Sequence, residues 1–208
     1  KNLSKLENRG MASPDHVIRT KGAPLHIKNI ADYQDEKVLK KHIEGFSNRY
    51  IKYFNRQSKR ADEKKSILTA DPKHGWLRSI GVIGLGKNAK EASATADLAE
   101  QNLHIRIISE KFGGFFPIKE KDMFDCEYWS LEQAKLGKGK PPAFEGKVVV
   151  ITGGAGTIGL ETAKAFSQLG ANILLVDNNQ KQLDIALSKL TPWDKSFCCD
   201  ITDINSAK

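Results

Sequence analysis

Three glycines in the segment TGGAGTIG have the spacing of a phosphate-binding turn. Gly154, Gly156 and Gly159 form the pattern G-x-G-x-x-G, which follows the β-branched run VVVIT and opens a helical pattern. In such a turn the first glycines let backbone N–H groups approach a pyrophosphate, and the last lets the helix pack closely on its strand. The positive end of the helix adds to the attraction of the anion. The segment therefore predicts a pyrophosphate-binding turn.

An aspartate follows at the position where a dinucleotide site holds the ribose. Asp177 ends the apolar run ANILLVD, twenty-one residues after Gly156. Its carboxylate can accept hydrogen bonds from the ribose hydroxyls and would repel a 2′-phosphate, which favours NAD over NADP. A glycine fingerprint alone is weak support, and a strand–helix turn without a ligand is the alternative. Here strand, fingerprint, helix, second strand and terminal acid occur in register, which favours nucleotide binding.

The elements that must position this turn follow from the hydrophobic pattern. VVVIT has no polar alternation, as is typical of a parallel strand covered on both faces. Apolar residues at helical spacing predict two helices, one through Thr162, Ala165, Phe166 and Leu169 and one through Leu183, Ala186, Leu187 and Leu190. Gly170 ends the first helix, ANILLVD forms a second strand, and SFCCDITD forms a third strand ending at Asp200.

Residues 1–140 differ in composition and are expected to form a separate module. Residues 1–34 show no regular pattern, whereas residues 35–60 have apolar residues at helical spacing. The further expected elements are, in chain order, a strand in WLRSIGVIGLG, a helix in KNAKEASATADLAEQNL, a strand in HIRIISEKF and a short helix in DCEYWSLEQAKL. The first three together have the length of a parallel strand–helix–strand crossover. The linker GKGKPPAFEG marks the boundary to residues 141–208.

The overall composition excludes several classes of protein. With 39% hydrophobic and 28% charged residues the chain is ordinary for a globular protein, and no uncharged apolar stretch is long enough to span a membrane. The net charge of +8 comes from lysines scattered among acidic residues, without the basic run and interleaved aromatics of a nucleic-acid module. Three cysteines without metal-ligand spacing fit a reducing cytoplasm. We therefore expect a cytoplasmic protein that binds neither nucleic acid nor a membrane.

Two other motifs could carry chemistry but are better explained without it. Tyr33 and Lys37 match the Y-x-x-x-K of a proton-transfer pair, yet they precede the glycine turn by more than a hundred residues. Residues 81–88, GVIGLGKN, differ from a P-loop by Asn88 in place of the hydroxyl that would ligate Mg²⁺. Their amides and Lys87 could still hold an anion, but a structural turn is the simpler interpretation.

The C-terminal segment resembles the short-chain dehydrogenase/reductase family. TGGAGTIG is similar to the family's T-G-x-x-x-G-x-G turn, and CCDITD to its third-strand D-[VI]-T-D. Thr157 stands where many members have glycine, and Gly156 one position earlier gives the variant T-G-x-x-G-x-x-G. The resemblance implies a cofactor site with the pyrophosphate at Gly153, Gly156, Ile158 and Gly159, the ribose at Asp177, and the adenine at Asp200 and Ile201. Gly154, Ala155, Thr157 and Asn178 complete the predicted NAD site.

The upstream segments narrow the resemblance to one family. ASPDHVIRTKGAPL, GLGKNAKEA and FDCEYWSLEQAKLGK, ahead of a dehydrogenase opening, are similar to the bifunctional rhamnulose-1-phosphate aldolase/short-chain dehydrogenases. The resemblance implies that residues 1–140 are a connecting region after a class II aldolase-like domain and that residues 141–208 are the N-terminal part of a Rossmann domain. It places the zinc histidines before residue 1 and the catalytic Ser and Y-x-x-x-K after Lys208, so we expect a piece of a longer enzyme. The histidines that are present, His16, His26, His42, His74 and His104, are far apart and predict no zinc site.

These observations predict an α/β fold, namely the N-terminal part of a doubly wound parallel sheet preceded by a smaller mixed α/β connecting region. The intact protein is expected to be an NAD-dependent oxidoreductase that transfers hydride to or from a small hydroxy or aldehyde substrate, by resemblance lactaldehyde, with no catalytic residue in this chain. A non-catalytic assembly module and an anion- or nucleotide-sensing module are the alternatives. Because three strands leave the outer edge of the third uncovered, we expect self-association into a homo-oligomer or disorder near the C-terminus.

Overall fold

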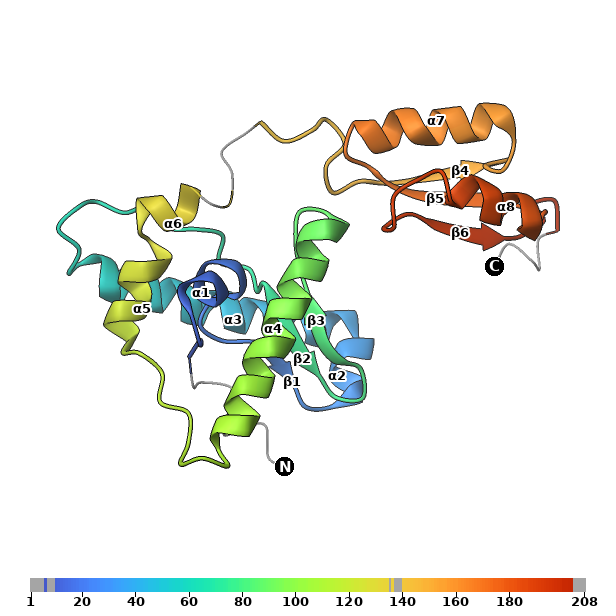
Figure 1. Ribbon diagram of the computed structural model, residues 1–208. Helices are drawn as coiled ribbons and strands as arrows, with labels where there is room; N and C mark the ends of the chain where they lie inside the picture. Colours follow the sequence, from blue (N-terminus) through green and yellow to red (C-terminus); the bar gives the residue numbers. More distant parts are fainter. Residues whose placement is uncertain (1–5, 7–9, 135, 137–139, 204–208) are drawn as a thin grey trace. The chain divides into compact units, whose positions relative to one another are not determined.

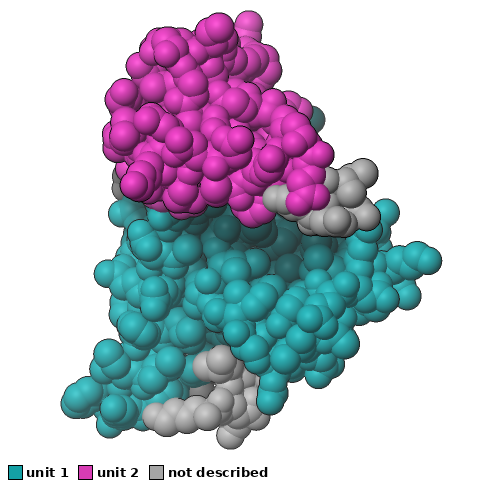
Figure 2. All heavy atoms as spheres, turned by 90° about the vertical axis from the view of Figure 1, so that its right-hand side faces the viewer, with its two compact units in different colours: residues 1–86, 92–138 teal, residues 87–91, 139–208 magenta. Residues whose placement is uncertain are grey.

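The computed structural model describes residues 6, 10–134, 136 and 140–203. The chain forms two compact units, which Figure 2 shows in different colours. Unit 1 comprises residues 1–86 and 92–138, and unit 2 comprises residues 87–91 and 139–208. None of the helices in the described residues is both long enough and apolar enough to cross a membrane.

Unit 1 combines helices with a small three-stranded sheet (Figure 1). Its elements in chain order are α1 (Pro14–Thr20), β1 (Leu25–Ile27), α2 (Ile30–Gln34), α3 (Glu36–Ser58), β2 (His74–Leu77), β3 (Gly81–Gly84), α4 (Ala89–Ser109), α5 (Glu120–Glu127) and α6 (Ser130–Ala134). β1 and β2 are parallel, whereas β2 and β3 form an antiparallel hairpin. α3 packs against β1, where Phe46 and Tyr50 join Leu25 and Ile27 in one buried cluster.

α3 confirms the amphipathic helix predicted over residues 35–60. Asp35 caps this helix, because its carboxylate accepts hydrogen bonds from the backbone N–H groups of Lys37 (2.8 Å) and Val38 (3.1 Å). The buried side chains of the helix are those of Phe46, Tyr50, Phe54 and Gln57. They recur at helical spacing, so one face of α3 is buried.

Several predictions for unit 1 were wrong. Residues 1–34 are not irregular, since α1, β1 and α2 lie within them. WLRSIGVIGLG forms the two strands of a hairpin that turns through Ser79 (φ 67°), and HIRIISEKF continues α4 to Ser109 instead of forming a strand. These segments are therefore a hairpin followed by a helix, not a parallel crossover. The single helix predicted in DCEYWSLEQAKL is divided into α5 and α6.

The error over α4 arises because this helix buries a mostly polar face. Its buried residues are Thr95, Ala99, Asn102 and Arg106, whereas the side chain of Ile108 is 53% exposed. The guanidinium of Arg106 donates hydrogen bonds to the backbone oxygens of Leu6 (2.6 Å) and Gly10 and lies 5.5 Å from the ring of Trp76. Burial lowers the pKa of Arg106 to about 10. Backbone carbonyls therefore stabilise a cation that the hydrophobic pattern alone would place at the surface.

A buried histidine makes the stability of unit 1 depend on pH. His74 is 1% exposed, and its Nδ1 lies 2.9 Å from the backbone oxygen of Thr20. Burial lowers the pKa of His74 from 6.5 to about 4, although the contact with Thr20 acts in the opposite direction. The unfolded chain therefore binds this proton at a higher pH than the folded chain. As a result, His74 decreases the free energy of unfolding as the pH falls from about 6.5 to about 4.

An NMR titration of the His74 ring tests this interpretation. We expect the ring of the folded chain to stay neutral at pH 5 and to take up its proton near pH 4, because the proton has to enter a buried site. A midpoint close to the ordinary value of a histidine would show that the ring is in contact with water.

Unit 2 contains a parallel three-stranded sheet in the order β4-β5-β6 (Figure 1). Its elements in chain order are β4 (Val148–Thr152), α7 (Thr157–Gln168), β5 (Asn172–Asp177), α8 (Gln180–Leu187) and β6 (Lys195–Cys198). The strict alternation of parallel strands and helices confirms the predicted first part of a doubly wound sheet, and the mixed sheet of unit 1 confirms the predicted α/β region before it.

Both helices of unit 2 pack on the same face of its sheet. One buried cluster joins Ile151, Ile173 and Leu175 of the strands with Leu160 and Ala163 of α7 and with Leu183 and Ala186 of α8. On the opposite face, Val148 and Val150 are 67% and 58% exposed. The prediction that VVVIT is covered on both faces is therefore wrong for the described residues, because alternate side chains of β4 meet helices on one side only.

The first helix of unit 2 lies where it was predicted, but of the apolar side chains predicted for its buried face only Phe166 packs against the buried cluster. Ala163 is fully buried, whereas Thr162 and Ala165 are exposed and Leu169 is 45% exposed. The helical spacing fits both faces, and the face with the small Ala163 allows the closer approach to the sheet. The face predicted for α8 is confirmed by Leu183 and Ala186, which are buried.

The edges of this sheet bear on the predicted self-association. β4 and β6 are the outer strands of the described sheet, and Phe197 of β6 is 54% exposed. Exposed strand edges and apolar side chains favour association, so a homo-oligomer stays a prediction. Residues 204–208, for which disorder was predicted, lie outside the described residues.

The buried face of the sheet should control the stability of unit 2. Leu175 is fully buried in its cluster, so Leu175→Ala is expected to lower the free energy of unfolding by about 2–5 kcal/mol. Ile158→Ala is the control, because that side chain is 84% exposed and its loss should change stability by less than about 0.5 kcal/mol. Hydrogen exchange of the amides in β4 and β5 measures both. If the amides of β4 and β5 exchanged equally slowly in both variants, Leu175 would not belong to the buried core.

Candidate functional site

The glycine turn between β4 and α7 is held against the end of β5. The backbone N–H of Gly154 donates to the carbonyl of Val176 (3.1 Å), and the N–H of Gly156 donates to the carbonyl of Gly153 (3.1 Å). Gly153 has a φ of +64°, a conformation that side-chain-bearing residues rarely adopt. The turn is therefore tight, and its shape depends on glycine at its first position.

Two further glycines allow close packing around this turn. A Cβ at Gly159 would lie 2.3 Å from the carbonyl oxygen of Gly153, and a Cβ at Gly154 would lie 2.8 Å from that of Ile151. Gly156 is less restricted, since its nearest neighbour would be the same Gly153 oxygen at 3.3 Å. Only glycine at position 159 permits α7 to start directly at the turn. The geometry agrees with the close helix–strand packing that a dinucleotide fingerprint requires.

The first turn of α7 presents backbone donors that no described residue satisfies. Gly156 is the N-cap of this 12-residue helix and provides no side-chain cap. Among the described residues, the N–H groups of Thr157, Ile158 and Gly159 have no acceptor, and the side chain of Ile158 is 84% exposed. Free donors at a helix N-terminus attract an anion. These residues therefore fit the phosphates of a dinucleotide.

Asp177 lies at the end of β5 and contacts the turn directly. Its carboxylate accepts hydrogen bonds from the backbone N–H of Ala155 (3.2 Å) and from that of Asn179 (3.2 Å). The carbonyl of Asp177 accepts from the N–H of Cys199, which links it to the chain after β6 (2.9 Å). The structure thus brings together Asp177 and the glycine turn, two features that the sequence separates by about twenty residues.

The remaining predicted residues follow the carboxyl ends of β5 and β6. Asn178 is exposed next to Asp177, and Ile201 is 56% exposed. Asp200 lies two residues beyond the end of β6, so this strand is shorter than predicted. Hydrogen bonds from the side-chain hydroxyl (2.7 Å) and backbone N–H (2.9 Å) of Thr202 hold the pKa of Asp200 below its ordinary value. In parallel strands these ends share one edge of the sheet with the glycine turn.

Asp194 lies at the opposite, amino-terminal edge of this sheet, directly before β6, and was missed by the sequence analysis. It is 3% exposed, and its carboxylate accepts from the N–H of Ile173 (2.7 Å) and from the N–H and hydroxyl of Thr191 (2.9 and 2.8 Å). These bonds fasten the segment after α8 to β5. The only sequence signal is the spacing of Thr191 and Asp194, which is common in loops.

The second glycine turn, residues 81–88, is closed by its own side chains. The N–H of Glu91 donates to the side chain of Asn88 (2.9 Å), and the carboxylate of Glu91 accepts from the N–H of Lys87 (3.1 Å). Asn88 thus caps the start of α4, and the carboxylate of Glu91 reaches back to the residue before this cap. A Cβ at Gly84 would lie 2.0 Å from the carbonyl oxygen of Ala92, so this glycine serves close packing. The turn of residues 81–88 therefore has a structural role, in agreement with the simpler interpretation of its sequence.

Two other candidates, the Tyr33–Lys37 pair and a metal site, were also compared with the structure of the described residues. Tyr33 lies in α2 and Lys37 in α3, and the hydroxyl of Tyr33 donates to the carbonyl of Arg78 (2.9 Å). The two side chains therefore do not share one helix, as a proton-transfer pair would require. Within the described residues no three His, Cys, Asp or Glu side chains are grouped so as to hold a metal ion.

Comparison with protein families assigns both parts of the chain. Residues 1–136 match the family "Aldolase class II, second domain", and residues 147–208 match "short chain dehydrogenase". The chain belongs to the class II aldolase family. Its aldolase part is followed by a short-chain dehydrogenase segment, so the predicted combination of an aldolase-associated region and a dehydrogenase opening is confirmed. The further restriction to rhamnulose-1-phosphate rests on the sequence resemblance alone.

The chain is also similar to individual known proteins. It is 31% identical over 179 residues to "Uncharacterized oxidoreductase YuxG" of Bacillus subtilis, which covers 84% of the chain and 26% of YuxG. It is 33% identical over 99 residues to "Short-chain dehydrogenase reductase 4" of Arabidopsis thaliana, covering 44% of the chain and 33% of that protein. The chain thus spans about a quarter to a third of the length of these relatives. A solved 2-keto-3-deoxy-D-gluconate dehydrogenase from Streptococcus agalactiae is 36% identical over 32% of the chain and 26% of its own length, with a TM-score of 0.30.

The close packing at Gly159 gives a testable consequence for the turn. Gly159→Ala places a methyl group against backbone atoms, so we expect unit 2 to lose about 1–3 kcal/mol of unfolding free energy. Gly45→Ala in α3 is the matched control, since its Cβ would meet only the end of Arg49 at 3.7 Å and should stabilise the helix by about 0.5–1 kcal/mol. Urea unfolding followed by circular dichroism measures both changes. A stabilising effect of Gly159→Ala would contradict the described turn.

Proposed function

We propose that the turn of residues 153–159 binds the pyrophosphate of NAD and that the intact protein is an NAD-dependent oxidoreductase of the short-chain dehydrogenase type. The observation that carries the proposal is the group of unsatisfied N–H donors at Thr157, Ile158 and Gly159 beside the carboxylate of Asp177. Short-chain dehydrogenases use NAD or NADP, and the segment that matches this family contains both features. A bound nicotinamide would supply or accept the hydride.

The residues of this chain would bind and orient the coenzyme. The amides at the start of α7 would donate to the phosphate oxygens, and the positive end of the helix dipole would add to the attraction. The exposed segment at Asp200 and Ile201 would lie along the adenine ring. Because Gly153 and Gly156 carry no side chain, the backbone can approach the phosphates closely.

Asp177 would determine the preference for NAD. Its carboxylate already accepts one hydrogen bond from Ala155, which holds it at the turn, and an ionised carboxylate has further lone pairs for the ribose hydroxyls. The same negative charge would repel the 2′-phosphate of NADP. The preference therefore depends on the charge of a single side chain.

The substrate of the intact protein is proposed from the family resemblance. A small hydroxy or aldehyde compound such as lactaldehyde would exchange hydride with the nicotinamide, and an aldolase in the same protein would be one source of an aldehyde. We further propose a cytoplasmic homo-oligomer that acts on a small molecule.

Coenzyme binding can be tested on this chain without any catalysis. Calorimetric titration of the chain with NADH should show saturable binding that is tighter than that of NADPH. Asp177→Asn keeps an oxygen that can accept from Ala155 but removes the charge, so it should weaken NADH binding about tenfold or more and abolish the discrimination against NADPH. Asp184→Asn, an exposed acid of α8, is the control and should leave both affinities unchanged. An unchanged preference in Asp177→Asn would refute the assigned role, and the absence of NADH binding would favour a non-catalytic assembly module.

A further inference from the structure

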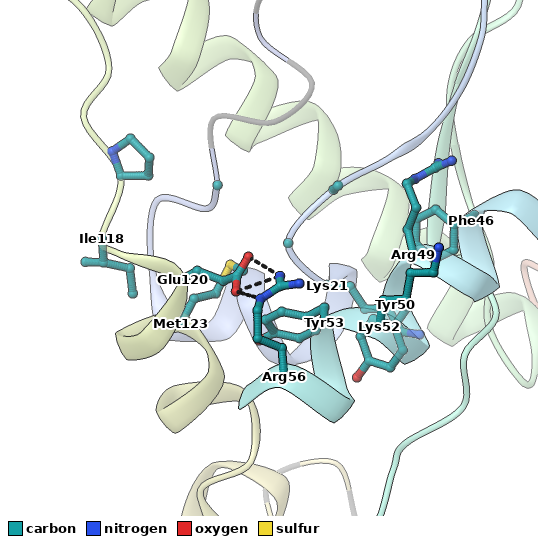
Figure 3. A pocket seen from close by; sticks show the side chains of 14 residues that line it. Lys21, Phe46, Arg49, Tyr50, Lys52, Tyr53, Arg56, Ile118, Glu120 and Met123 are labelled. Carbon is teal, nitrogen blue, oxygen red and sulfur yellow. Dashed lines mark hydrogen bonds and ion pairs between the residues drawn. The ribbon is translucent and has the colours of Figure 1, made fainter. Parts of the chain in front are cut away.

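Unit 1 contains a cavity of about 520 Å³ that the dehydrogenase assignment does not use. It lies between α3, the loop after α1 and the start of α5 (Figure 3). Four cationic side chains line it, Lys21, Arg49, Lys52 and Arg56, together with the single carboxylate of Glu120. Aromatic and aliphatic side chains form the rest of its wall. Such a combination of volume, apolar wall and converging charge is typical of a small-molecule site.

Lys21 places a buried cation at this cavity. The residue is only 4% exposed and has a φ of 63°, which is uncommon for a residue other than glycine. Its ammonium donates to the backbone oxygen of Thr69 and lies 3.6 Å from the centre of the Tyr50 ring. Burial lowers the pKa of Lys21 to about 8, so the amine is still mostly protonated at neutral pH. The carbonyl of Thr69 and the face of the Tyr50 ring use two of its three N–H donors, which leaves one for another partner.

The tyrosines of the cavity are fixed by hydrogen bonds that point away from it. The hydroxyls of Tyr50 and Tyr53 donate to the carboxylate of Glu127 at 2.8 and 3.0 Å. Glu127 is 2% exposed, and burial raises its pKa. The hydroxyl of Tyr128 lies 2.8 Å from that of Tyr50 and completes the network. The rings of Tyr50 and Tyr53 are thereby held as a rigid wall of the cavity.

The rim of the cavity carries more positive than negative charge. Figure 3 shows Arg56 joined to Glu120 by hydrogen bonds. The Nε of Arg56 lies 3.0 Å and one of its terminal nitrogens 2.8 Å from Oε1 of Glu120. Arg49 lies over the ring of Phe46 at 5.9 Å, and no carboxylate in the described part of the chain pairs with Arg49 or Lys52. Three cations, Lys21, Arg49 and Lys52, therefore face one cavity whose only lining acid is already paired. Such an excess of like charge is stabilised by a bound anion.

We propose that this cavity binds a small organic dianion with an apolar or aromatic body. The dianionic head would be held by Lys21, Arg49 and Lys52, because charge-assisted hydrogen bonds from several cations favour two negative charges over one. The body would pack on the tyrosine rings and on Ile118 and Met123. A phosphomonoester and a dicarboxylate share this chemistry. The site lies wholly within unit 1 and does not depend on coenzyme binding in unit 2.

Calorimetric titration of the chain with three compounds of similar body tests the proposal. Phenyl phosphate and phenylmalonate are dianions near pH 7, where Lys21 is mostly protonated, and benzyl alcohol is neutral. We expect saturable binding of at least one dianion and none of the alcohol, and the stronger dianion identifies the head group. Arg49→Gln and Lys52→Gln should each weaken dianion binding about tenfold. Lys40→Gln removes an exposed lysine of the same helix that does not line the cavity, so it should leave the affinity unchanged.

Three results would overturn the proposal. One is no saturable dianion binding by the folded chain. The second is equal weakening in Lys40→Gln and Lys52→Gln, which would show attraction to the overall charge of the protein. The third is binding that survives both rim substitutions, which would place the anion elsewhere, for example at the glycine turn of unit 2. Circular dichroism of each variant confirms that the helices of unit 1 are intact.

Discussion

The close approach of α7 to the turn after β4 is the constraint on which the candidate site depends. The backbone of Gly159 leaves no room for a Cβ beside the carbonyl of Gly153, so the helix can begin at the turn only if this position is glycine. Because the helix begins there, its first N–H groups face outward without a side-chain cap. The same turn receives the carboxylate of Asp177 from the neighbouring strand. The N–H donors and the carboxylate that we propose for phosphate and ribose thus come together through one steric restriction.

The stability of unit 1 depends on a different feature. Its interior contains charged side chains whose hydrogen-bond partners are mainly neutral groups. Backbone carbonyls hold Arg106, phenol hydroxyls hold Glu127, and a carbonyl with aromatic rings holds Lys21. A buried charge is tolerated only when such partners replace the water that it loses. Because Lys21 is fixed in this way at the wall of a cavity, its charge is available to a ligand as well as to the fold.

The sequence predicts unit 2 better than unit 1 for a physical reason. In unit 2 the glycines, the β-branched strands and the terminal Asp177 each require one local geometry, and the elements found agree with them. The hydrophobic pattern of β4 did not show that α7 and α8 cover the same face of the sheet. Which face of a strand is covered depends on the elements that pack against it, and the residues of the strand alone do not show this. In unit 1, α4 buries Asn102 and Arg106 while Ile108 is exposed, so hydrophobic periodicity indicated a strand. The cavity was not predicted, because Lys21 comes from the loop after α1 and the lining cations of α3 follow no binding motif in the sequence.

Backbone-amide NMR of this chain during a titration with NADH tests the central claim most directly. We expect saturable shifts of the Thr157, Ile158 and Gly159 amides, together with a shift at Ala155 as its contact with Asp177 responds to the ribose. Amides of the β1-β2-β3 sheet should stay unchanged. If saturating NADH leaves the amides of the glycine turn unmoved, the turn does not hold the coenzyme and the proposed function is wrong.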